Sequence, residues 1–214
     1  MLKAVSESPD WRDGLLFVGN HPALDFLNTR PVLSGEEPTE LLPDFAALLR
    51  WFRAANMLGP REASELWRQC GESERARRAL DSLHRLRESF RKEILKYEAG
   101  GHVHRATIEE INKLMASHPM RTRLIVTEEG FRTEAYCDPR GPEDLLGPVS
   151  YSIAALFADL DRTKIRKCSN CVLHFYDTSK KGTRRWCSMQ MCGNQAKVAA
   201  YAARHRRRGR RLST

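Results

Sequence analysis

The sequence predicts an α+β fold: a mainly helical N-terminal domain with a small antiparallel sheet, followed by a small treble-clef-like module. Apolar residues recur at helical spacing over most of residues 44–160. Alternating apolar and polar residues at 122–137 are typical of a β-hairpin. Four cysteines cluster near the C-terminus, which indicates a separate module. We therefore predict two domains, residues 1–160 and residues 161–214.

The elements of the first domain follow from local patterns. The apolar run from Gly14 to Gly19 predicts one strand, and residues 20–30 predict a short helical turn. The proline-containing stretch 31–43 predicts a loop. Helical periodicity and end signals then predict helices over residues 44–59, 60–70, 72–98, 107–118 and 149–160, with the hairpin before the last of them.

The net charge of +9 is unevenly divided along the chain. Residues 162–214 contain 15 Lys and Arg against a single acid, Asp177, which gives +14. Residues 1–161 contain 21 Lys and Arg against 26 Asp and Glu, which gives −5. Such asymmetry favours a basic segment that contacts a polyanion; the alternative is a solvated tail that aids solubility.

Two classes of protein are disfavoured by composition. No apolar stretch approaches the ~20 residues of a membrane span, and residues 1–13 contain three acids and no apolar run, unlike a secretory signal. We therefore expect a cytoplasmic protein without a membrane partner. Six cysteines in 214 residues, four of them within one short segment, suit a metal site in a reducing compartment better than a disulfide scaffold.

The cysteine spacing predicts one structural zinc ion. Cys168 and Cys171 are separated by two residues, and Cys187 and Cys192 follow after a further fifteen. Zinc takes four tetrahedral ligands, and four thiolates leave no open position for catalysis. The remaining cysteines, Cys70 and Cys137, are isolated and are expected to be buried or inert.

The order of these ligands is typical of a treble-clef finger. A tight knuckle would hold Cys168 and Cys171, and the fifteen intervening residues would form a hairpin whose return strand delivers Cys187. Ser188 suits the N-cap of a helix that contains Cys192 in its first turn. His174 could compete as a ligand, but we expect it on the surface of the hairpin.

Basic residues surround the predicted zinc site. In the helix after Cys192, spacings of seven and four place three of them on one face. Such a patch releases counterions from phosphates and predicts nucleic-acid binding. The alternative is that a few of these charges only neutralise the −2 charge of a four-thiolate zinc site. The candidate nucleic-acid contacts are Lys180, Lys181, Arg184, Arg185, Lys197, Arg204, Arg207 and Arg208.

Two segments carry a family resemblance that spans essentially the whole chain. The run 184–189, Arg-Arg-Trp-Cys-Ser-Met, and the triplet Cys-Gly-Asn at 192–194 resemble the CGNR zinc finger. The run 20–29, Asn-His-Pro-Ala-Leu-Asp-Phe-Leu-Asn-Thr, resembles the opening motif of the ABATE domain, found in proteins described as stress-induced bacterial transcription regulators. The resemblance implies that the four cysteines bind zinc. One position departs from the motif, because Gln195 stands where the family has arginine.

The opening motif contains a second candidate site. His21, Asp25, Asn28 and Thr29 lie within nine residues, and a helix would place the first three on one face. They could bind a small polar effector, or they could cap and cross-link the backbone as a structural cluster. His21 and Asp25 could also act as a general acid and base, but no nucleophile motif, phosphate loop or catalytic metal spacing accompanies them.

Taken together, these features predict a DNA-binding transcription regulator rather than an enzyme. Duplex DNA is the favoured partner; RNA binding or a protein-docking zinc module are the alternatives. A single finger has a small footprint, so operator binding would need a homodimer, which the N-terminal helices could provide.

Overall fold

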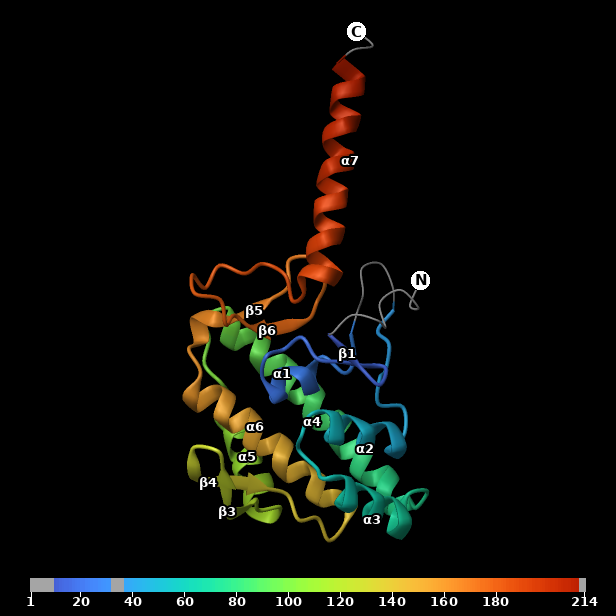
Figure 1. Ribbon diagram of the computed structural model, residues 1–214, viewed down its shortest axis with the longest axis vertical. Coiled ribbons are helices and arrows are strands. Elements are labelled where there is room, and N and C mark those ends of the chain that lie inside the picture. Colours follow the sequence, from blue (N-terminus) through green and yellow to red (C-terminus); the bar gives the residue numbers. More distant parts are fainter. Residues whose placement is uncertain (1–9, 32–36, 212–214) are drawn as a thin grey trace.

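The computed structural model describes residues 10–31 and 37–211, and of residues 200, 203, 204 and 206–211 it describes only the backbone. It confirms an α+β fold, with a helical body at one end and the C-terminal helix standing out from the other (Figure 1). None of the helices in the described ranges is long and apolar enough to span a membrane.

Helices account for most of the body. The α-helices are α1 (Pro22–Leu27), α2 (Phe45–Ala54), α3 (Pro60–Cys70), α4 (Glu74–Glu98), α5 (Arg105–Ser117), α6 (Leu146–Asp159) and α7 (Asn194–Arg211). Short 3₁₀ turns occur at η2 (Pro142–Leu145) and η3 (Arg162–Lys164), and a π-helical turn, η4 (Met189–Gly193), leads into α7.

The body is built around the 25-residue helix α4, which packs against α1, α2 and α6. Its buried stripe includes Leu83 and Phe90, as the apolar period of the sequence predicts. Trp51 of α2 is fully buried, and its ring contacts those of Phe26 and Phe52 at centroid separations of 5.5 and 5.2 Å. This core holds α1 and the residues that follow it in place.

Local end signals determine where the helices begin. Asp44 caps α2 by accepting a 2.7 Å hydrogen bond from the backbone N–H of Ala47. Ser73 caps α4 in the same way, and Pro60 occupies the first turn of α3, where no N–H is needed. Helix α5 begins at Arg105, two residues before the predicted start.

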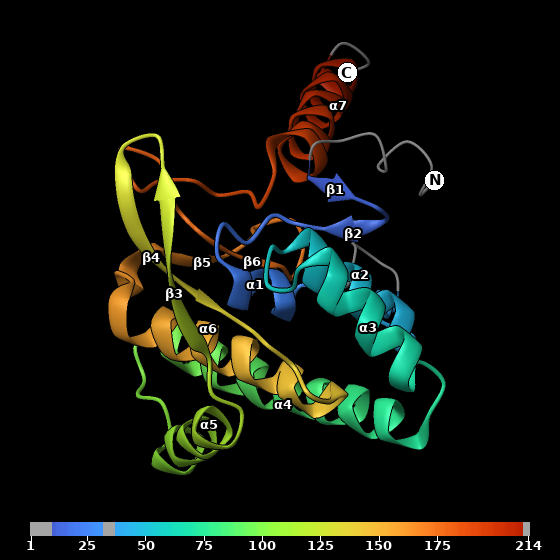
Figure 2. The same ribbon diagram turned by 60° about the horizontal axis from the view of Figure 1, so that its bottom comes forward.

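Three two-stranded antiparallel sheets complete the described structure. They pair β1 (Trp11–Arg12) with β2 (Leu15–Leu16), β3 (Arg121–Thr127) with β4 (Gly130–Tyr136), and β5 (Ile165–Lys167) with β6 (His174–Tyr176). The predicted hairpin at 122–137 is β3–β4, and Figure 2 shows it as an arm beside the helices.

The strand predicted over residues 14–19 is confirmed at Leu15–Leu16, although it is shorter than expected. It is the second strand of a tight ribbon, β1–β2, whose turn is Asp13-Gly14. Both turn residues have positive φ, 52° and 75°, which a two-residue hairpin turn of this kind requires. The Asp-Gly pair was the signal in the sequence that the strand prediction overlooked.

The buried apolar residues form two clusters. The larger one joins the helices of the body. The smaller one surrounds the four clustered cysteines and includes Leu16 and Val18 from the N-terminal ribbon, with Trp11 packed against it. The ribbon, although first in sequence, therefore contributes to the core of the C-terminal module.

Candidate metal centre and basic surface

The four clustered cysteines converge on one point. All four sulfurs are buried and lie within 4.8 Å of one another. The separations Cys171–Cys187, Cys187–Cys192 and Cys192–Cys171 are 3.6, 3.6 and 3.5 Å. A tetrahedron with zinc–sulfur bonds of about 2.3 Å has edges of about 3.8 Å, so the four sulfurs fit a zinc ion. The chain is positioned to bind one zinc ion that has no open coordination site.

The first two ligands come from a hairpin built around the knuckle. Strands β5 and β6 pair on either side of Cys168 and Cys171, and the N–H of Cys168 donates to the carbonyl of Leu173 at 2.8 Å. We predicted a hairpin between the two cysteine pairs instead, and this is wrong, because residues 177–186 contain no strand. The connection still returns to the knuckle, where the N–H of Ser169 donates to the carbonyl of Arg185 at 2.9 Å.

Cys192 lies in the first turn of the C-terminal helical segment, as predicted, and Cys187 directly precedes its cap. Ser188 caps η4, and its hydroxyl accepts a 3.2 Å hydrogen bond from the N–H of Met191. Gly193 ends this turn, and its N–H donates to the carbonyl of Ser188 at 3.0 Å. Knuckle, connecting loop and capped helix together form the treble-clef-like order.

Gln195 connects the helix to the knuckle. Its Oε1 accepts a 3.0 Å hydrogen bond from the side-chain amide of Asn170, which lies between the two knuckle cysteines. The residue that replaces the family's arginine is therefore placed to orient the first helical turn against the metal site.

The four sulfurs form a site that a cation would stabilise. Four neighbouring thiolates in a buried site repel one another unless a metal ion supplies compensating charge. A bound zinc ion would supply this charge and keep all four thiols deprotonated.

Residues in and around α1 hydrogen-bond to the metal module, by which we mean residues 162–211. The side-chain amide of Asn28 donates to the carbonyl of His174 at 2.8 Å and its oxygen accepts from the N–H of His174 at 3.0 Å. The N–H of Tyr176 donates to the carbonyl of Gly19 at 2.8 Å. Asp10 accepts a hydrogen bond from the hydroxyl of Ser188, which connects the ribbon to the helix cap. These contacts fix the orientation of the module on the body.

His174 is not on the surface, contrary to our prediction. Its side chain is 2% exposed, and its Nε2 lies 3.2 Å from Oε2 of Glu98 at the end of α4. The other carboxylate oxygen of Glu98 accepts a 2.7 Å hydrogen bond from the N–H of Lys167. Burial opposes ionisation of Glu98, but the hydrogen bonds from His174 and Lys167 outweigh it and lower its pKa. Sequence reasoning missed Glu98, because no local pattern distinguishes it from other helix-end acids.

The outer surface of the metal module carries unpaired positive charge. Within residues 162–211, in the described part of the chain, the ion pairs are Arg166 with Asp177 and His174 with Glu98. The side chain of Asp177 is fully buried, and it also accepts hydrogen bonds from the N–H groups of Ser179 and Arg184. The one acid of residues 162–211 is therefore used internally and forms no ion pair with the exposed cations.

The predicted nucleic-acid residues divide into three groups. Four are exposed and unpaired in the described part of the chain: Lys180, Lys181, Arg185 and Lys197. Arg184 is half-buried and donates to the carbonyls of Trp186 and Cys187, so its guanidinium supports the loop that delivers a zinc ligand. Arg204, Arg207 and Arg208 belong to α7, but their side chains lie outside the described residues.

The four polar residues of the N-terminal motif all make contacts within the protein. His21 caps α1 by accepting from the N–H of Ala23, and Asp25 accepts a 2.7 Å hydrogen bond from the N–H of Gly19. Asn28 binds the metal module, as described above. The hydroxyl of Thr29 donates to the carbonyl of Phe26 at 2.7 Å. These contacts match the structural alternative; a ligand-binding role stays a prediction.

Asp25 has an unusual environment. Its carboxyl is largely buried, and this burial raises its pKa to about 7, although hydrogen bonds from Gly19 and Val18 and the charge of Arg12 act in the opposite direction. Asp25 and Arg12 also line a small cavity of about 140 Å³ together with Phe17. Burial therefore favours the protonated form of Asp25 relative to an exposed aspartate.

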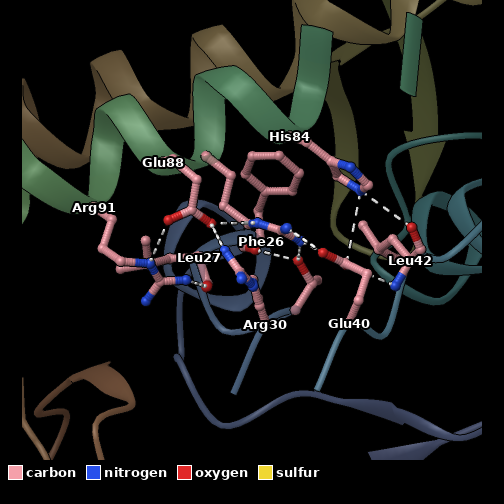
Figure 3. A network of polar contacts seen from close by, with 10 residues as sticks. Phe26, Leu27, Arg30, Glu40, Leu42, His84, Glu88 and Arg91 are labelled. Carbon is pink, nitrogen blue, oxygen red and sulfur yellow. Dashed lines mark hydrogen bonds and ion pairs between the residues drawn. The ribbon is translucent and has the colours of Figure 1, made fainter. Parts of the chain in front are cut away.

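Figure 3 shows a network of polar contacts between α4 and the residues after α1, which includes Glu40, Glu88 and Arg91. Thr29 joins this network through a hydrogen bond from Arg87. Arg87 of α4 is 1% exposed; it donates to the hydroxyl of Thr29 at 2.7 Å and pairs through two nitrogens with Glu40. Nearby, Arg91 donates to the carbonyl of Leu27 at 2.7 Å. The network supplies hydrogen-bond donors to the C-terminal end of α1. Asn28, which binds the metal module, lies at the same end. Sequence reasoning did not single out Arg87, because it continues the charged pattern of the helix.

Comparison with protein families agrees with this geometry. A model of the ABATE family, described as "Putative stress-induced transcription regulator", matches residues 20–160. A model of the CGNR zinc finger matches residues 164–205. No curated protein matches the chain. Neither family description names an enzymatic activity.

Proposed function

We propose that this chain, which belongs to the ABATE family and ends in a CGNR zinc finger, regulates transcription by binding duplex DNA through the zinc module. In this proposal residues 1–160 serve sensing or assembly, and residues 161–214 form the DNA-binding domain of a cytoplasmic, non-enzymatic protein. The family descriptions support a regulator with a zinc module. DNA as the partner is our own inference.

One observation carries the proposal: the only acid of residues 162–214 is buried, while four cations of the module are exposed without an ion pair in the described part of the chain. Nearly every charge that the module shows to solvent is therefore positive. Such a surface binds phosphates and displaces their counterions. A role limited to neutralising the zinc thiolates needs only two positive charges.

The shape of α7 favours a duplex. The helix has 18 residues, which at 1.5 Å per residue is about 27 Å, and it stands out from the body (Figure 1). A major groove of B-DNA admits one α-helix of this kind. Lys197 in its first turns and the arginines of its second half, including Arg204, Arg207 and Arg208, would contact phosphates or bases. The module has no cluster of exposed aromatic residues among those described, which disfavours single-stranded nucleic acid.

Fluorescence anisotropy with the zinc-loaded full-length chain tests the proposal. A labelled 30-base-pair duplex, a single strand and an RNA duplex would be titrated across a salt series. We expect tightest binding to duplex DNA and a steep fall of affinity with salt. A triple variant, Lys180→Gln, Lys181→Gln and Arg185→Gln, should reduce the slope of log affinity against log salt by about 0.9 for each phosphate that the variant no longer neutralises.

A charge-matched control separates a local contact from a general charge effect. Arg50→Gln, Arg53→Gln and Arg78→Gln remove the same charge from exposed positions of the body. We expect this variant to bind almost as the wild type does. Equal weakening by both triple variants would contradict a site on the zinc module, and no binding at low salt would favour a protein-docking module.

A further inference from the structure

The β3–β4 hairpin presents an apolar face to solvent. Leu124, Val126 and Phe131 are 68%, 77% and 75% exposed, the highest values among the large hydrophobic residues of the body. In a solvated two-stranded sheet the apolar face usually packs inward and the polar face points outward. In this hairpin the apolar face points outward to solvent instead.

The strand register places these residues together. Val126 pairs with Phe131 and Leu124 with Thr133, and Thr122 pairs with Ala135. Because side chains alternate between the faces of a strand, these six residues share one face, which we call the outer face. All six are exposed, and none carries a charge.

The opposite face of the hairpin holds the charged residues. Arg123 donates to Glu134 at 2.7 and 2.9 Å, and its guanidinium lies 4.8 Å from the centre of the Tyr136 ring. These three residues line a cavity of about 560 Å³ with the connection between α2 and α3. The polar face is therefore turned toward the body, which leaves the outer face free for a partner.

We propose that the outer face binds the same face of a second copy of this chain, so that the protein is a two-fold symmetric dimer. A face without charge is complementary to itself, because no like charges meet across the symmetry axis. Neither strand has another neighbouring strand in the described structure, and an isolated two-stranded sheet is at best marginally stable in water. Stacking on a second hairpin buries what the monomer leaves exposed.

The composition of the face fits an interaction site. Contiguous exposed apolar patches on a monomer commonly mark such sites. Three large, highly exposed apolar side chains lie together here, and a two-fold contact would cover them on both copies.

Charge selects the orientation of the two hairpins. The turn contains Glu128 and Glu129, both exposed and without an ion pair in the described part of the chain. The arginines at the open end, Arg121 and Arg123, lie on the opposite face and pair with Asp138 and Glu134. A two-fold axis along the strands would place four glutamates together, whereas an axis across the strands places the two acidic turns at opposite ends of the contact. The second arrangement is favoured, with the two hairpins antiparallel.

Sedimentation velocity of the full-length, zinc-loaded chain from 1 to 100 μM tests this inference. We expect a dimer for the wild type, and for Val126→Glu a monomer, with the dissociation constant raised at least 100-fold, because each copy would bury a charge in an apolar contact. Circular dichroism and zinc content should stay unchanged, which shows that the variant folds.

A matched control and a cross-link locate the contact. Val198→Glu introduces the same charge at a valine that is 68% exposed on α7, and it should leave the dimer intact. A photoreactive benzoylphenylalanine at position 131 should cross-link to residues 122–135 of the second copy. A wild type that is monomeric at 100 μM would overturn the inference, as would a dimer that survives Val126→Glu. The result is independent of what the zinc module binds, so failure of the dimer and failure of DNA binding are distinguishable.

Discussion

The helical body and the zinc module solve the same problem of stability in different ways. The body buries a large set of apolar side chains, and the fully buried Arg87 pairs with Glu40. The module has a small apolar cluster around four sulfurs and leaves most of its cations without carboxylate partners in the described part of the chain. A core this small cannot hold a repulsive surface together without the metal. We therefore infer that the metal module tolerates repulsion between its unpaired cations because zinc binding stabilises its fold.

Removal of a zinc ligand should give the largest effect. Cys187→Ser is expected to lower the zinc content from one ion per chain to none, because structural zinc sites contribute on the order of 10 kcal/mol or more. The module should lose protection from amide hydrogen exchange while α2, α4 and α6 retain it. Metal analysis and hydrogen-exchange mass spectrometry check this result.

Cys70→Ser is the matched control for that experiment. Cys70 lies outside the cluster, and its sulfur contacts the carbonyl of Leu66 at 3.0 Å, a contact that a serine hydroxyl reproduces. This variant should keep its zinc. If the body also unfolds in Cys187→Ser, the two regions are one cooperative unit and the comparison fails.

The second-largest expected effect is the dependence of the free energy of unfolding on pH, through Asp25. The folded pKa of Asp25, about 7, lies above its unfolded value near 3.8, so the folded state binds the proton more tightly. Stability should therefore fall as pH rises from about 4 to 7, by up to about 4 kcal/mol for three pKa units. Asp25→Asn should remove this part of the pH dependence.

Urea unfolding of the wild type and Asp25→Asn at pH 5, 6, 7 and 8 measures the difference. Zinc release at low pH affects both proteins equally and cancels in the comparison. Asp161→Asn is the control, because the pKa of that exposed carboxyl is lowered by Thr163 and it stays ionised over this range. Parallel curves for the wild type and Asp25→Asn would show that Asp25 is ionised in the fold.

The third-largest expected effect on the free energy of unfolding is the loss of the buried ion pair between Arg87 and Glu40. Arg87→Met leaves the half-buried carboxylate of Glu40 without its main partner, which should cost about 3 kcal/mol. Arg75→Met breaks an exposed pair with Glu143 and should cost less than about 1 kcal/mol. Chemical unfolding of both variants measures the contrast, and equal costs would contradict a special role for the network at the end of α1.

The smallest expected effect lies at the cap of the C-terminal helix. Ser188→Ala removes the acceptor for the N–H of Met191 and the contact with Asp10, at a cost of about 1 kcal/mol. Zinc affinity measured by competition with a chelator should fall about five-fold. Ser64→Ala, an exposed serine in α3, should change nothing beyond about 0.5 kcal/mol. Tighter zinc binding by Ser188→Ala would show that the cap strains the metal site.

Local patterns predicted most of the body. The stripes of α2 and α4, the β3–β4 hairpin and the helix ends at Asp44 and Pro60 depend on neighbours within a few positions, and these predictions are confirmed. The strand predicted at 14–19 is shorter than expected, Leu15–Leu16, because a two-residue turn at Asp13-Gly14 pairs it only with Trp11–Arg12. The surface position of His174 was wrong because its environment comes from Glu98, 76 positions away.

The sequence by itself determined the zinc ligands, their treble-clef-like order and the charge of the C-terminal module, because thiol spacing and charge are properties of short segments. Only the tertiary structure decided what the polar residues do. Asn28 became a clamp on the backbone of His174, 146 positions away, and Arg184 turned inward to support Cys187. Buried polar groups require partners, and which partners they meet depends on how distant segments pack.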